Sequence, residues 1–539
     1  MDRSRTKQVC TIGPASADRI SELVAAGMDV ARVNFSHGSP GDHRAYVHAV
    51  RSAAHSARRS VAVMVDLPGP KIRLGGLKGG VVRLENGATF TLWPESPPEP
   101  ADSAAAPSDD RDQAADTAPE LTDVHESTKT TSEEDPASND VADTTGSVMA
   151  VSEPTRAPQA IGNASGVTVS TPDLAALLQV GDRVLLADGA AELRVTAISG
   201  SVVETEVVHG GTVRSRSGVN IPSSRLGGHG LTDQDRAAIP LALELRADLI
   251  AQSFVRSADD VRSLRSMLPA DGPRVVAKIE TGAAVDNFDE IAEVADGIMV
   301  ARGDLGVDIP FEEVPLVQKA LVRRATKAGR FSIVATQMLE SMTAAPRPTR
   351  AEASDVANAV LDGADAVMLS AETAIGAFPV EALQAMARIC AKTETDGSDL
   401  TVSANPPVGI APADEIIAAA TYIASRDPQM GASAIWCFTR SGRTAELLSL
   451  QRPGMPIIAF TLSPIVARRL AVRTAVVPMV LSATGAKDEP LIGRMENAWR
   501  AQKSRTTFET VILVTTSRQP GGINRIEIHR PAGQAAGGH

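Results

Sequence analysis

The chain has few aromatic residues and little cysteine. Aromatic side chains make up 3% of its 539 residues, so its cores have to be built mainly from aliphatic side chains. Cys10, Cys390 and Cys437 are far apart and odd in number, which excludes a disulfide framework and favours a reducing cytoplasm. No apolar run approaches the roughly 20 residues that span a bilayer. The N-terminal MDRSRTKQVC lacks an apolar core, so we expect neither a membrane anchor nor a secretory signal.

Most of the chain also lacks an excess of charge of either sign. The net charge is −12, but residues 97–160 alone hold 15 acidic and 3 basic residues, so the remainder is close to neutral. A neutral body argues against nucleic acid as a partner. The acidic segment is rich in Pro, Ala, Ser, Asp and Glu and almost free of large apolar side chains. It cannot bury enough surface to fold, and we predict a disordered insertion at about 97–165.

Eight short apolar runs that end in polar or glycine-containing motifs alternate with amphipathic stretches. They read QVCTIGP, DVARVNFSH, SVAVMVDLPG, LIAQSFVR, RVVAKIE, GIMVARGD, FSIVATQM and AVMLSAET. Strands that alternate with helices favour a parallel sheet, and eight such units predict an α/β fold of the (β/α)₈, or TIM barrel, type. In such a barrel the functional residues lie where the strands end.

Two further domains are expected. Short β-rich runs flank the acidic segment, namely VVRLENGATFTLW, GVTVS, DRVLLADG, AELRVTAIS and SVVETEVV, and predict a small all-β domain. From about Ala413 a helix and the runs SAIWCF, PIIAF, VVPMVL, VILVTT and RIEIH indicate a separate α/β domain. The expected division is barrel at 1–73 and 226–395, inserted β domain at 74–225, and C-terminal α/β domain with a flexible tail at 396–539.

The fifth and sixth strands end in the residues with the clearest chemistry. Strand alternation places Lys278 and Glu280 on one side, and Asp304 supplies a second carboxylate from the next strand end. Two carboxylates suit Mg²⁺ or Mn²⁺, because hard divalent ions take oxygen ligands. A lysine beside that metal would stabilise a developing oxyanion or a transferring phosphoryl group. A surface salt bridge is the alternative for any one of these residues, but two such motifs at successive strand ends argue against it.

The second strand places Arg32, Asn34 and Ser36 on one face. Arg32 can pair with a phosphate or a carboxylate. His37 follows, and either a functional or a structural histidine is compatible with its position.

Other strand ends carry further candidates. The third strand ends at Asp66, and Thr336 at the seventh offers a hydroxyl as a proton relay or substrate ligand. Glu372 and Thr373 at the eighth either support the site or make local hydrogen bonds.

A possible anion site lies in the C-terminal domain, where a strand runs through Thr439, Arg440, Ser441, Gly442, Arg443 and Thr444 into a helix. Hydroxyls, a glycine and backbone N–H groups at a helix N-terminus bind phosphate, and the two arginines favour this interpretation over an ordinary N-cap.

The ordered motifs resemble those of the pyruvate kinase family over nearly the whole chain outside the acidic segment. They include CTIGPAS, VARVNFSHG, VDLPGPKIR, AKIET, GIMVARGDLGVDIP, ATQMLESM, PTRAEASDVANAVLDGADAVMLSAETA and FTRSGRTAELLS. The resemblance implies transfer of a phosphoryl group from phosphoenolpyruvate to ADP, giving pyruvate and ATP in the last step of glycolysis. It also implies a homotetramer in the cytoplasm, with a phosphorylated allosteric effector at 439–444 and the β domain as a lid.

The resemblance also assigns roles to residues. Phosphoenolpyruvate would contact Arg32, Lys278, Gly303, Asp304 and Thr336. The divalent metal would bind Glu280 and Asp304, while Arg32, Lys278 and Thr336 would act in catalysis. The nucleotide would contact Asn34, Ser36, His37 and Arg73. A monovalent cation would bind Asn34, Ser36, Asp66 and Leu67. Asp188 matches a lid residue that faces the active site.

Several positions depart from the family pattern, among them Ala371 and Ile375, which replace a frequent Gly and Lys around SAETA. The end of the chain, TTSRQPGGINRIEIH, lacks part of the family's glycine-rich loop. Lys71 stands where potassium-dependent members usually carry Glu, and a lysine there goes with potassium independence, because its ammonium group replaces the cation. Ser217 occupies the place of a common lid lysine near the nucleotide, with Arg216 beside it. Thr281 replaces a common Asn after Glu280.

Two other functions remain open from the residues alone. A barrel lyase or aldolase acting on short oxo acids would use the same lysine and carboxylates, without a nucleotide. A non-enzymatic sensor would keep only the phosphate loop, although intact Lys278, Glu280, Asp304 and Thr336 argue against it. Loss of phosphoenolpyruvate that requires ADP distinguishes the family activity from both.

Overall fold

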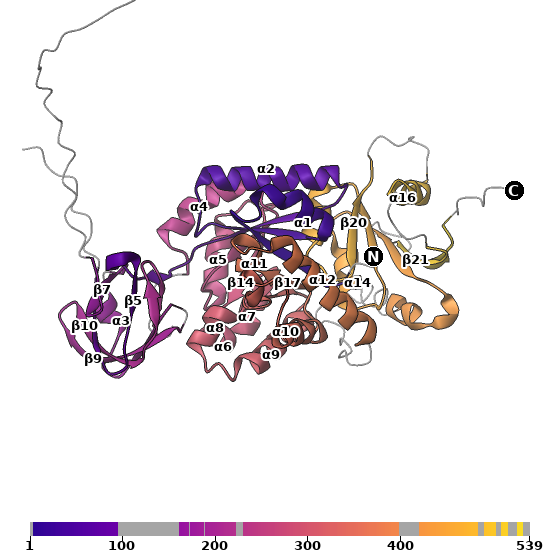
Figure 1. The fold of residues 1–539 in the computed structure, drawn as a ribbon. Helices are drawn as coiled ribbons and strands as arrows, with labels where there is room; N and C mark the ends of the chain where they lie inside the picture. The colour runs from indigo at the N-terminus through magenta and orange to yellow at the C-terminus, as the bar shows by residue number, and fades with distance from the viewer. Residues whose placement is uncertain are drawn as a thin grey trace, which may run out of the picture.

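The computed structural model describes residues 4–94, 161–171, 173–187, 189–221, 230–397, 420–482, 490–502, 508–515 and 525–531. Figure 1 shows three bodies in a row, with the β domain at one end, the barrel in the middle and the C-terminal domain at the other end. Most of the expected acidic insertion, Asp188 and the C-terminal tail lie outside the described residues. Within the described ranges no helix has the length and apolar character needed to cross a bilayer.

The central body is a closed parallel barrel, as the sequence predicted, with strand order β1-β17-β16-β15-β14-β13-β3-β2. Each of the eight predicted runs contains one strand. The strands are β1 (Lys7–Ile12), β2 (Val30–Asn34), β3 (Ala62–Asp66), β13 (Leu249–Gln252), β14 (Arg274–Ile279), β15 (Gly297–Ala301), β16 (Phe331–Ala335) and β17 (Ala366–Leu369).

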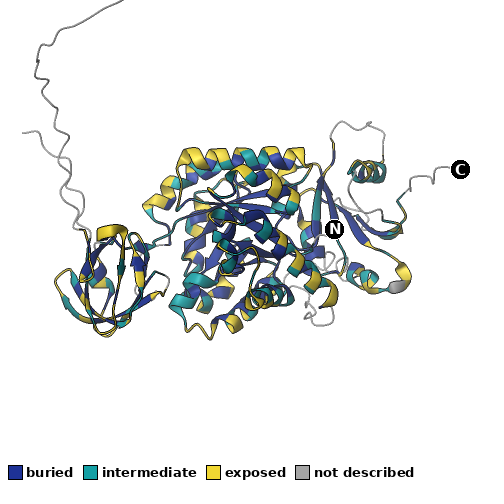
Figure 2. Cartoon of the chain, viewed as in Figure 1, coloured by how far each residue is buried: buried dark blue, intermediate teal, exposed yellow. Residues whose placement is uncertain are grey.

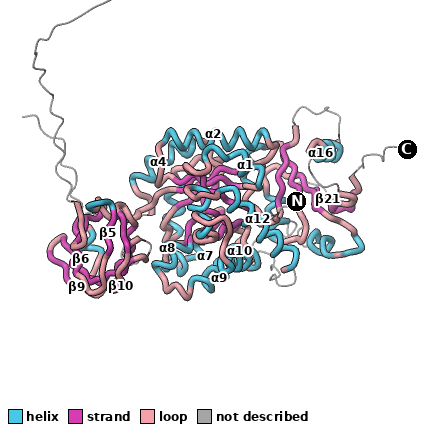
Figure 3. Tube along the Cα trace, viewed as in Figure 1, coloured by secondary structure: helices cyan, strands magenta, loops and turns pink. Residues whose placement is uncertain are grey.

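Helices surround the barrel, and Figure 3 shows them as a cyan shell around magenta strands. They are η1 (Ala17–Arg19), α1 (Ile20–Ala26), α2 (Pro40–Ser56), α4 (Asp233–Glu244), α5 (Ala258–Ser266), α6 (Gly282–Asp286), α7 (Phe288–Val294), α8 (Arg302–Asp308), α9 (Val314–Lys327), η4 (Glu340–Thr343), α10 (Arg350–Leu361), α11 (Ala371–Ala374) and α12 (Pro379–Asp396). Several begin at side-chain caps, since the hydroxyls of Ser39, Thr232 and Thr349 accept from the backbone three residues on.

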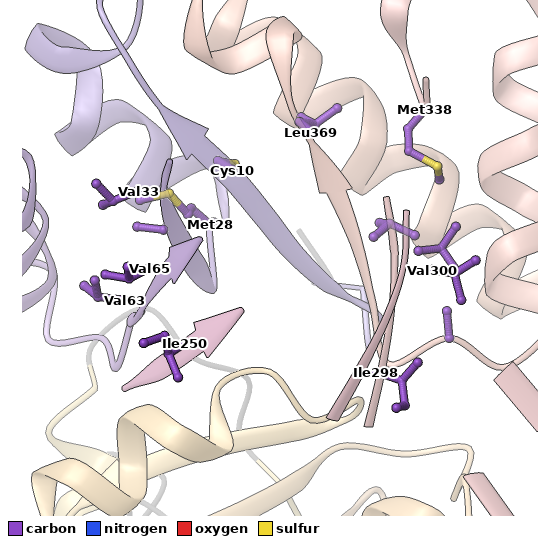
Figure 4. Close-up of a cluster of buried hydrophobic side chains, with 14 of the residues drawn as sticks. Cys10, Met28, Val33, Val63, Val65, Ile250, Ile298, Val300, Met338 and Leu369 are labelled. Atoms are coloured by element: carbon purple, nitrogen blue, oxygen red, sulfur yellow. The ribbon is translucent and has the colours of Figure 1, made fainter. Parts of the chain in front are cut away.

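Strand alternation divides the barrel's apolar residues into two layers. In β3, Val63 and Val65 belong to the large cluster between strands and helices, whereas Met64 belongs to the cluster inside the barrel. Figure 4 shows members of the outer layer, among them Val63 and Val65, and Figure 2 shows the strands as the main buried region. In β14, Val276 points inward. Lys278, two residues later, therefore faces the barrel axis.

The β domain has its own core and two sheets. Its main sheet has the order β4-β12-β8-β9-β10-β6-β7, and β5 pairs with β11. The strands are β4 (Ile72–Arg73), β5 (Val81–Arg83), β6 (Thr89–Pro94), β7 (Gly166–Val169), β8 (Arg183–Leu186), β9 (Ala191–Ser199), β10 (Val202–His209), β11 (Thr212–Arg214) and β12 (Gly218–Asn220), with η2 (Lys78–Gly80) and α3 (Leu174–Leu177). All five predicted β-rich runs form strands. β4, β11 and β12 were not foreseen.

The C-terminal body is the predicted α/β domain, with sheet order β20-β19-β18-β21-β22. Its strands are β18 (Ala434–Phe438), β19 (Ile457–Thr461), β20 (Val476–Val480), β21 (Val511–Thr515) and β22 (Arg525–His529). Its helical segments are η6 (Pro428–Met430), α14 (Arg443–Leu450), α15 (Pro464–Leu470) and α16 (Leu491–Arg500), and residues 420–426 are also helical. Ala471 and Val472, just after α15, join the cluster inside the barrel, so this domain closes the barrel's N-terminal end.

Buried ion pairs hold this closure. Asp365 is fully buried before β17 and accepts from both terminal nitrogens of Arg452 at 3.0 Å and from the Thr474 amide at 3.1 Å. The neighbouring Arg452 holds the pKa of Asp365 below its usual value, although burial opposes this shift. Asp248 similarly accepts from Arg468 at 2.8 Å and from Arg51 at 2.7 Å.

Replacing Asp365 by Ala should destabilise the full chain by about 3 kcal/mol, because it leaves a largely buried arginine and backbone amides without their acceptor. A fall of several degrees in the thermal unfolding midpoint is expected. Glu22→Ala, which removes an exposed partner of Arg19, is the control and should leave the midpoint unchanged. Equal midpoints for Asp365→Ala and the wild type would show that this contact contributes nothing to stability.

Candidate active site

The inward-facing Lys278 lies at the centre of a buried polar cluster. Its ammonium group is 2.9 Å from Glu280 Oε1 and 3.3 Å from Asp66 Oδ1, and it donates to Ser253 Oγ at 2.7 Å. These side chains come from the ends of the neighbouring strands β3, β13 and β14. The structure therefore brings Asp66, which the sequence placed at the end of the third strand, together with Lys278 and Glu280 from the end of the fifth.

The carboxylates determine the charge of this lysine. Burial disfavours the ammonium form, but the negative charges of Asp66 and Glu280 outweigh burial and raise the pKa of Lys278. Burial raises the pKa of Asp66, but the positive charges of Lys278 and Arg32 lower it by more. The pKa of Asp66 is therefore held below its usual value. Lys278 is therefore a fixed positive charge at the barrel mouth rather than a proton donor at neutral pH.

Arg32 extends the cluster to the next strand. Its Nε donates to Asp66 Oδ2 at 2.6 Å, and one terminal nitrogen donates to Thr11 Oγ1 at 2.9 Å. Asp66 thus lies between two cations and orients both. A fork-shaped guanidinium held in this way is suited to a phosphate or carboxylate group.

A second carboxylate faces Glu280. Burial raises the pKa of Glu280, Lys278 opposes that rise, and the charge of Asp304 adds to it. Asp304 forms an ion pair with Lys71, whose Nζ lies 3.0 Å from Asp304 Oδ1. Two acidic oxygen donors close enough to repel each other fit a divalent cation, which would relieve that repulsion. No group of three His, Cys, Asp or Glu with metal-binding geometry occurs in the described ranges.

Thr336 lies at the end of β16 in a strained conformation. Its φ of 69° is uncommon for a β-branched residue, and Gln337 follows at 54°. The Gly303 amide donates to Thr336 Oγ1 at 2.7 Å. Arg302 donates to the Thr336 carbonyl at 2.6 Å and is itself held by Asp355 at 2.7 Å. These contacts fix the hydroxyl beside the loop that carries Asp304.

The predicted nucleotide residues lie around the end of β2 and at β4. The Ser36 amide donates to Asn34 Oδ1 at 3.1 Å, which forms a local turn. Arg73 lies on β4 of the β domain and donates to the Arg216 carbonyl at 3.3 Å. Ser217 accepts from the Arg214 amide at 3.2 Å, so its hydroxyl takes part in a local turn.

His37 lies among cations. Burial lowers its pKa, and the positive charges of Arg73 and Arg32 lower it further. Its carbonyl oxygen is 2.8 Å from His43 Nε2, and His43 stacks on Phe35. The neutral ring therefore lies between Arg32 of the barrel and Arg73 of the β domain, while its backbone is fixed.

Other predicted positions have mainly local roles. Leu67 is buried, and its carbonyl accepts from Ser253 at 2.7 Å. Glu372 accepts from the Leu339 amide at 3.0 Å and the Ser370 amide at 2.7 Å, and Thr373 donates to the Thr11 carbonyl at 2.9 Å. For Glu372 and Thr373 the local hydrogen-bonding alternative describes what the structure contains.

The loop with Thr439, Arg440, Ser441, Gly442, Arg443 and Thr444 lies in the C-terminal domain, on the opposite side of the barrel from the β domain. Thr439 Oγ1 accepts from the Gly442 amide at 2.9 Å. Gly442 has a φ of 96°, which only glycine adopts readily, and α14 starts directly after it. Arg440, Ser441 and Arg443 are exposed.

Sequence reasoning overlooked three supporting residues. Ser253 accepts from Lys278, Thr11 accepts from Arg32, and Arg302 holds Thr336. Alternation could have found Ser253, which follows the inward-facing Ala251 by two residues. Gly69 marks the same place, because a Cβ there would lie 2.7 Å from the Ser253 side chain.

The fold and cluster define a (β/α)₈-barrel protein whose strand ends carry cations and carboxylates in close contact. Comparison with known protein families identifies the family to which the chain belongs. The model "Pyruvate kinase, barrel domain" matches residues 3–97 and 112–383, and "Pyruvate kinase, alpha/beta domain" matches 414–529.

Individual relatives agree with the family models. Pyruvate kinase of Geobacillus stearothermophilus is 36% identical, over 98% of this chain and 80% of the relative. Those of Mycobacterium intracellulare and of Mycobacterium tuberculosis (strain ATCC 25618 / H37Rv) are 38% and 36% identical, over 98% of both chains in each case. The chain belongs to the pyruvate kinase family, which confirms the resemblance seen in its motifs.

Asp66→Asn tests the electrostatics of the cluster. Because the pKa of Asp66 is lowered on folding, its charge contributes stability above the ordinary aspartate pKa of 3.8, and this contribution is lost as the pH falls through the folded-state value. The thermal midpoint of the wild type should exceed that of Asp66→Asn by a constant amount above about pH 5. Below that pH the difference should shrink. A difference that stays constant down to pH 3 would contradict the assigned pKa direction.

Proposed function

We propose that this chain transfers the phosphoryl group of phosphoenolpyruvate to ADP, giving pyruvate and ATP in the last step of glycolysis. The observation that carries the proposal is the ammonium group of Lys278, held between Asp66 and Glu280 at the mouth of a barrel whose sequence is that of a pyruvate kinase. The cluster supplies the charge that phosphoryl transfer requires, because catalysis of this step is mostly positioning and electrostatic stabilisation.

Substrate binding would use the cations at the strand ends. Arg32 would pair with the phosphate of phosphoenolpyruvate, since Asp66 and Thr11 already orient its guanidinium. Gly303, Asp304 and Thr336 would line the carboxylate side of the substrate. Lys278 would stabilise both the transferring phosphoryl group and the enolate left behind.

Glu280 and Asp304 would hold Mg²⁺ or Mn²⁺. When bound, this ion supplies Lewis-acid polarisation of the substrate oxygens. The contribution of the chain is to keep the two carboxylates in place. Glu280 does so by accepting from the Phe254 amide at 2.8 Å as well as from Lys278, and Asp304 does so through Lys71.

Thr336 would take part in protonating the enolate. Its hydroxyl donates to the Ala335 carbonyl at 2.5 Å and accepts from the Gly303 amide. The hydroxyl proton of Thr336 is therefore already engaged in a hydrogen bond to the Ala335 carbonyl oxygen. Delivery to the enolate requires rotation of the hydroxyl or relay through a water molecule, which makes Thr336 a relay rather than the original proton source.

The β domain would act as a lid. Arg73 belongs to its sheet, while Asn34, Ser36 and His37 belong to the barrel, so a nucleotide that contacts all four would lie between the two bodies. Closure of the lid would exclude water from the transfer step. The domain division at residues 73, 225 and 395 is part of the same proposal, with the first boundary moved ahead of β4, which pairs with β12 in the β domain.

Two regions support regulation and assembly. Arg440 and Arg443 are exposed at the start of α14 and could pair with the phosphate of an effector. Phe311 and Leu316 around the start of α9 are 79% and 70% exposed, which favours their burial against further copies in a homotetramer. The three described cysteines are reduced and buried, consistent with a cytoplasmic enzyme.

Lys278→Met should lower kcat by about a hundredfold to a thousandfold, because it removes the charge that stabilises the transition state. The assay measures pyruvate formed from phosphoenolpyruvate and ADP with Mg²⁺. Lys392→Met removes an exposed lysine and is the matched control, expected to keep full activity. Near-normal turnover of Lys278→Met would refute its role. Turnover of short oxo acids without ADP would instead favour a barrel lyase.

Lys71 should make the enzyme independent of potassium. Its ammonium group already sits 3.0 Å from Asp304, so a positive charge is present in the site in any buffer. Rates in sodium and potassium buffers of equal ionic strength should agree. Lys71→Glu should become dependent on K⁺, whereas Lys78→Glu, the same charge reversal on the exposed surface of the β domain, should not. Strong potassium activation of the wild type would overturn the idea, and Asn34, Ser36, Asp66 and Leu67 would then hold K⁺.

A further inference from the structure

A second cationic cavity lies far from the catalytic cluster, between the barrel and the C-terminal domain. It has a volume of about 290 Å³. Arg265 at the end of α5 and Arg274 at the start of β14 line it from the barrel, and Arg469 of α15 lines it from the other domain. The apolar Leu268 and the acidic Asp296 also line it. The cavity is thus at the opposite end of β14 from Lys278.

Arginines predominate among the charged residues that line this cavity. Arg265 pairs with Asp296 at 2.8 Å, and Arg274 pairs with Glu446. Arg469 donates from one terminal nitrogen to the carbonyl of Gly272 at 2.6 Å. Among the residues that line the cavity, three arginines accompany one carboxylate, that of Asp296. Glu446 lies outside the lining and pairs with Arg274, and Asp248 and Asp271 lie near Arg469.

Arg469 has unused hydrogen-bonding capacity. Its Nε is buried and lacks a hydrogen-bond partner within the ranges that the structure describes. A buried donor without an acceptor is destabilising unless water or a ligand satisfies it. Burial and the nearby charge of Arg274 lower the pKa of Arg469, while the charges of Asp248, Asp271 and Asp296 act in the opposite direction. An anion in the cavity would satisfy the donor.

The size and lining of the cavity limit the anion. Ligand pockets usually measure ~300–1,000 Å³, so this one suits a phosphate group with a few attached carbon atoms. Guanidinium groups match phosphate oxygens through paired hydrogen bonds. Leu268 and the neighbouring Pro269 and Pro273 form an apolar wall for the attached carbons.

We propose that this cavity is a phosphate site, filled by free phosphate or a small phosphate ester, that joins the barrel to the C-terminal domain through Arg274 and Arg469. It shares no residue with the loop at 439–444. Its occupant would contact β14, which carries Lys278, and α15, which leads to the residues that close the barrel.

Equilibrium binding of inorganic phosphate and of glycerol 3-phosphate to the full chain tests the proposal. Arg469→Gln and Arg265→Gln should each weaken binding of the anions to the cavity by at least about tenfold. This is the effect of losing one charge-assisted hydrogen bond, and Arg265 is the more exposed of the two residues. Two control variants report on anion binding at the loop 439–444 and at the active site. Arg440→Gln removes a cation from the loop at 439–444, and Arg32→Gln removes a cation from the active site. Both variants should leave anion binding at the cavity unchanged.

The outcomes separate the possible ligands and the possible sites. Tighter binding of glycerol 3-phosphate than of inorganic phosphate would identify an ester as the ligand, and equal affinities would identify free phosphate. If Arg469→Gln and Arg265→Gln fold and bind both anions as the wild type does, the proposal is wrong. It is also wrong if Arg440→Gln or Arg32→Gln accounts for all the binding. Arg469→Lys, which keeps the charge, should retain part of the affinity.

Discussion

The contact on which the active site depends is the buried ion cluster of Lys278, Asp66 and Glu280. An ammonium group in a barrel interior is stable only if carboxylates compensate for its lost hydration, and each carboxylate needs the cation for the same reason. The three groups come from β3 and β14, with Ser253 from β13 between them. The cluster therefore exists only when these strands are neighbours in the closed barrel, so that the fold and the charge arrangement depend on each other.

The same principle operates at the other end of the barrel. Asp365 and Asp248 are buried at the start of barrel strands and accept arginines from the C-terminal domain. Between the two charged ends lies the inner apolar cluster, which Ala471 and Val472 complete from the C-terminal side. The C-terminal domain thus contributes side chains to the core at the N-terminal end of the barrel. A ligand that alters its position acts on strands that carry catalytic residues at their opposite ends.

Two residues with strained backbone lie beside the candidate active site. Thr336 and Phe254 both have positive φ values, and each is held by contacts with neighbouring strand ends. The Arg302 fork fixes Thr336, and the Phe254 amide fixes Glu280. Across this rigid rim, the β domain presents Arg73 from a separate core. Rigid barrel groups for chemistry and a separate body for closure are what phosphoryl transfer protected from water requires.

The sequence by itself determined the eight barrel strands, the all-β domain, the C-terminal sheet and the family, because apolar periodicity and ordered motifs are local properties. It also located Lys278, Glu280 and Asp304 at strand ends. Only the tertiary structure decided their partners: Ser253 under Lys278, Lys71 on Asp304, and a cavity shared by Arg274 and Arg469. These contacts join residues distant in the chain, and their distances and burial follow from barrel closure and domain docking, which no local pattern encodes.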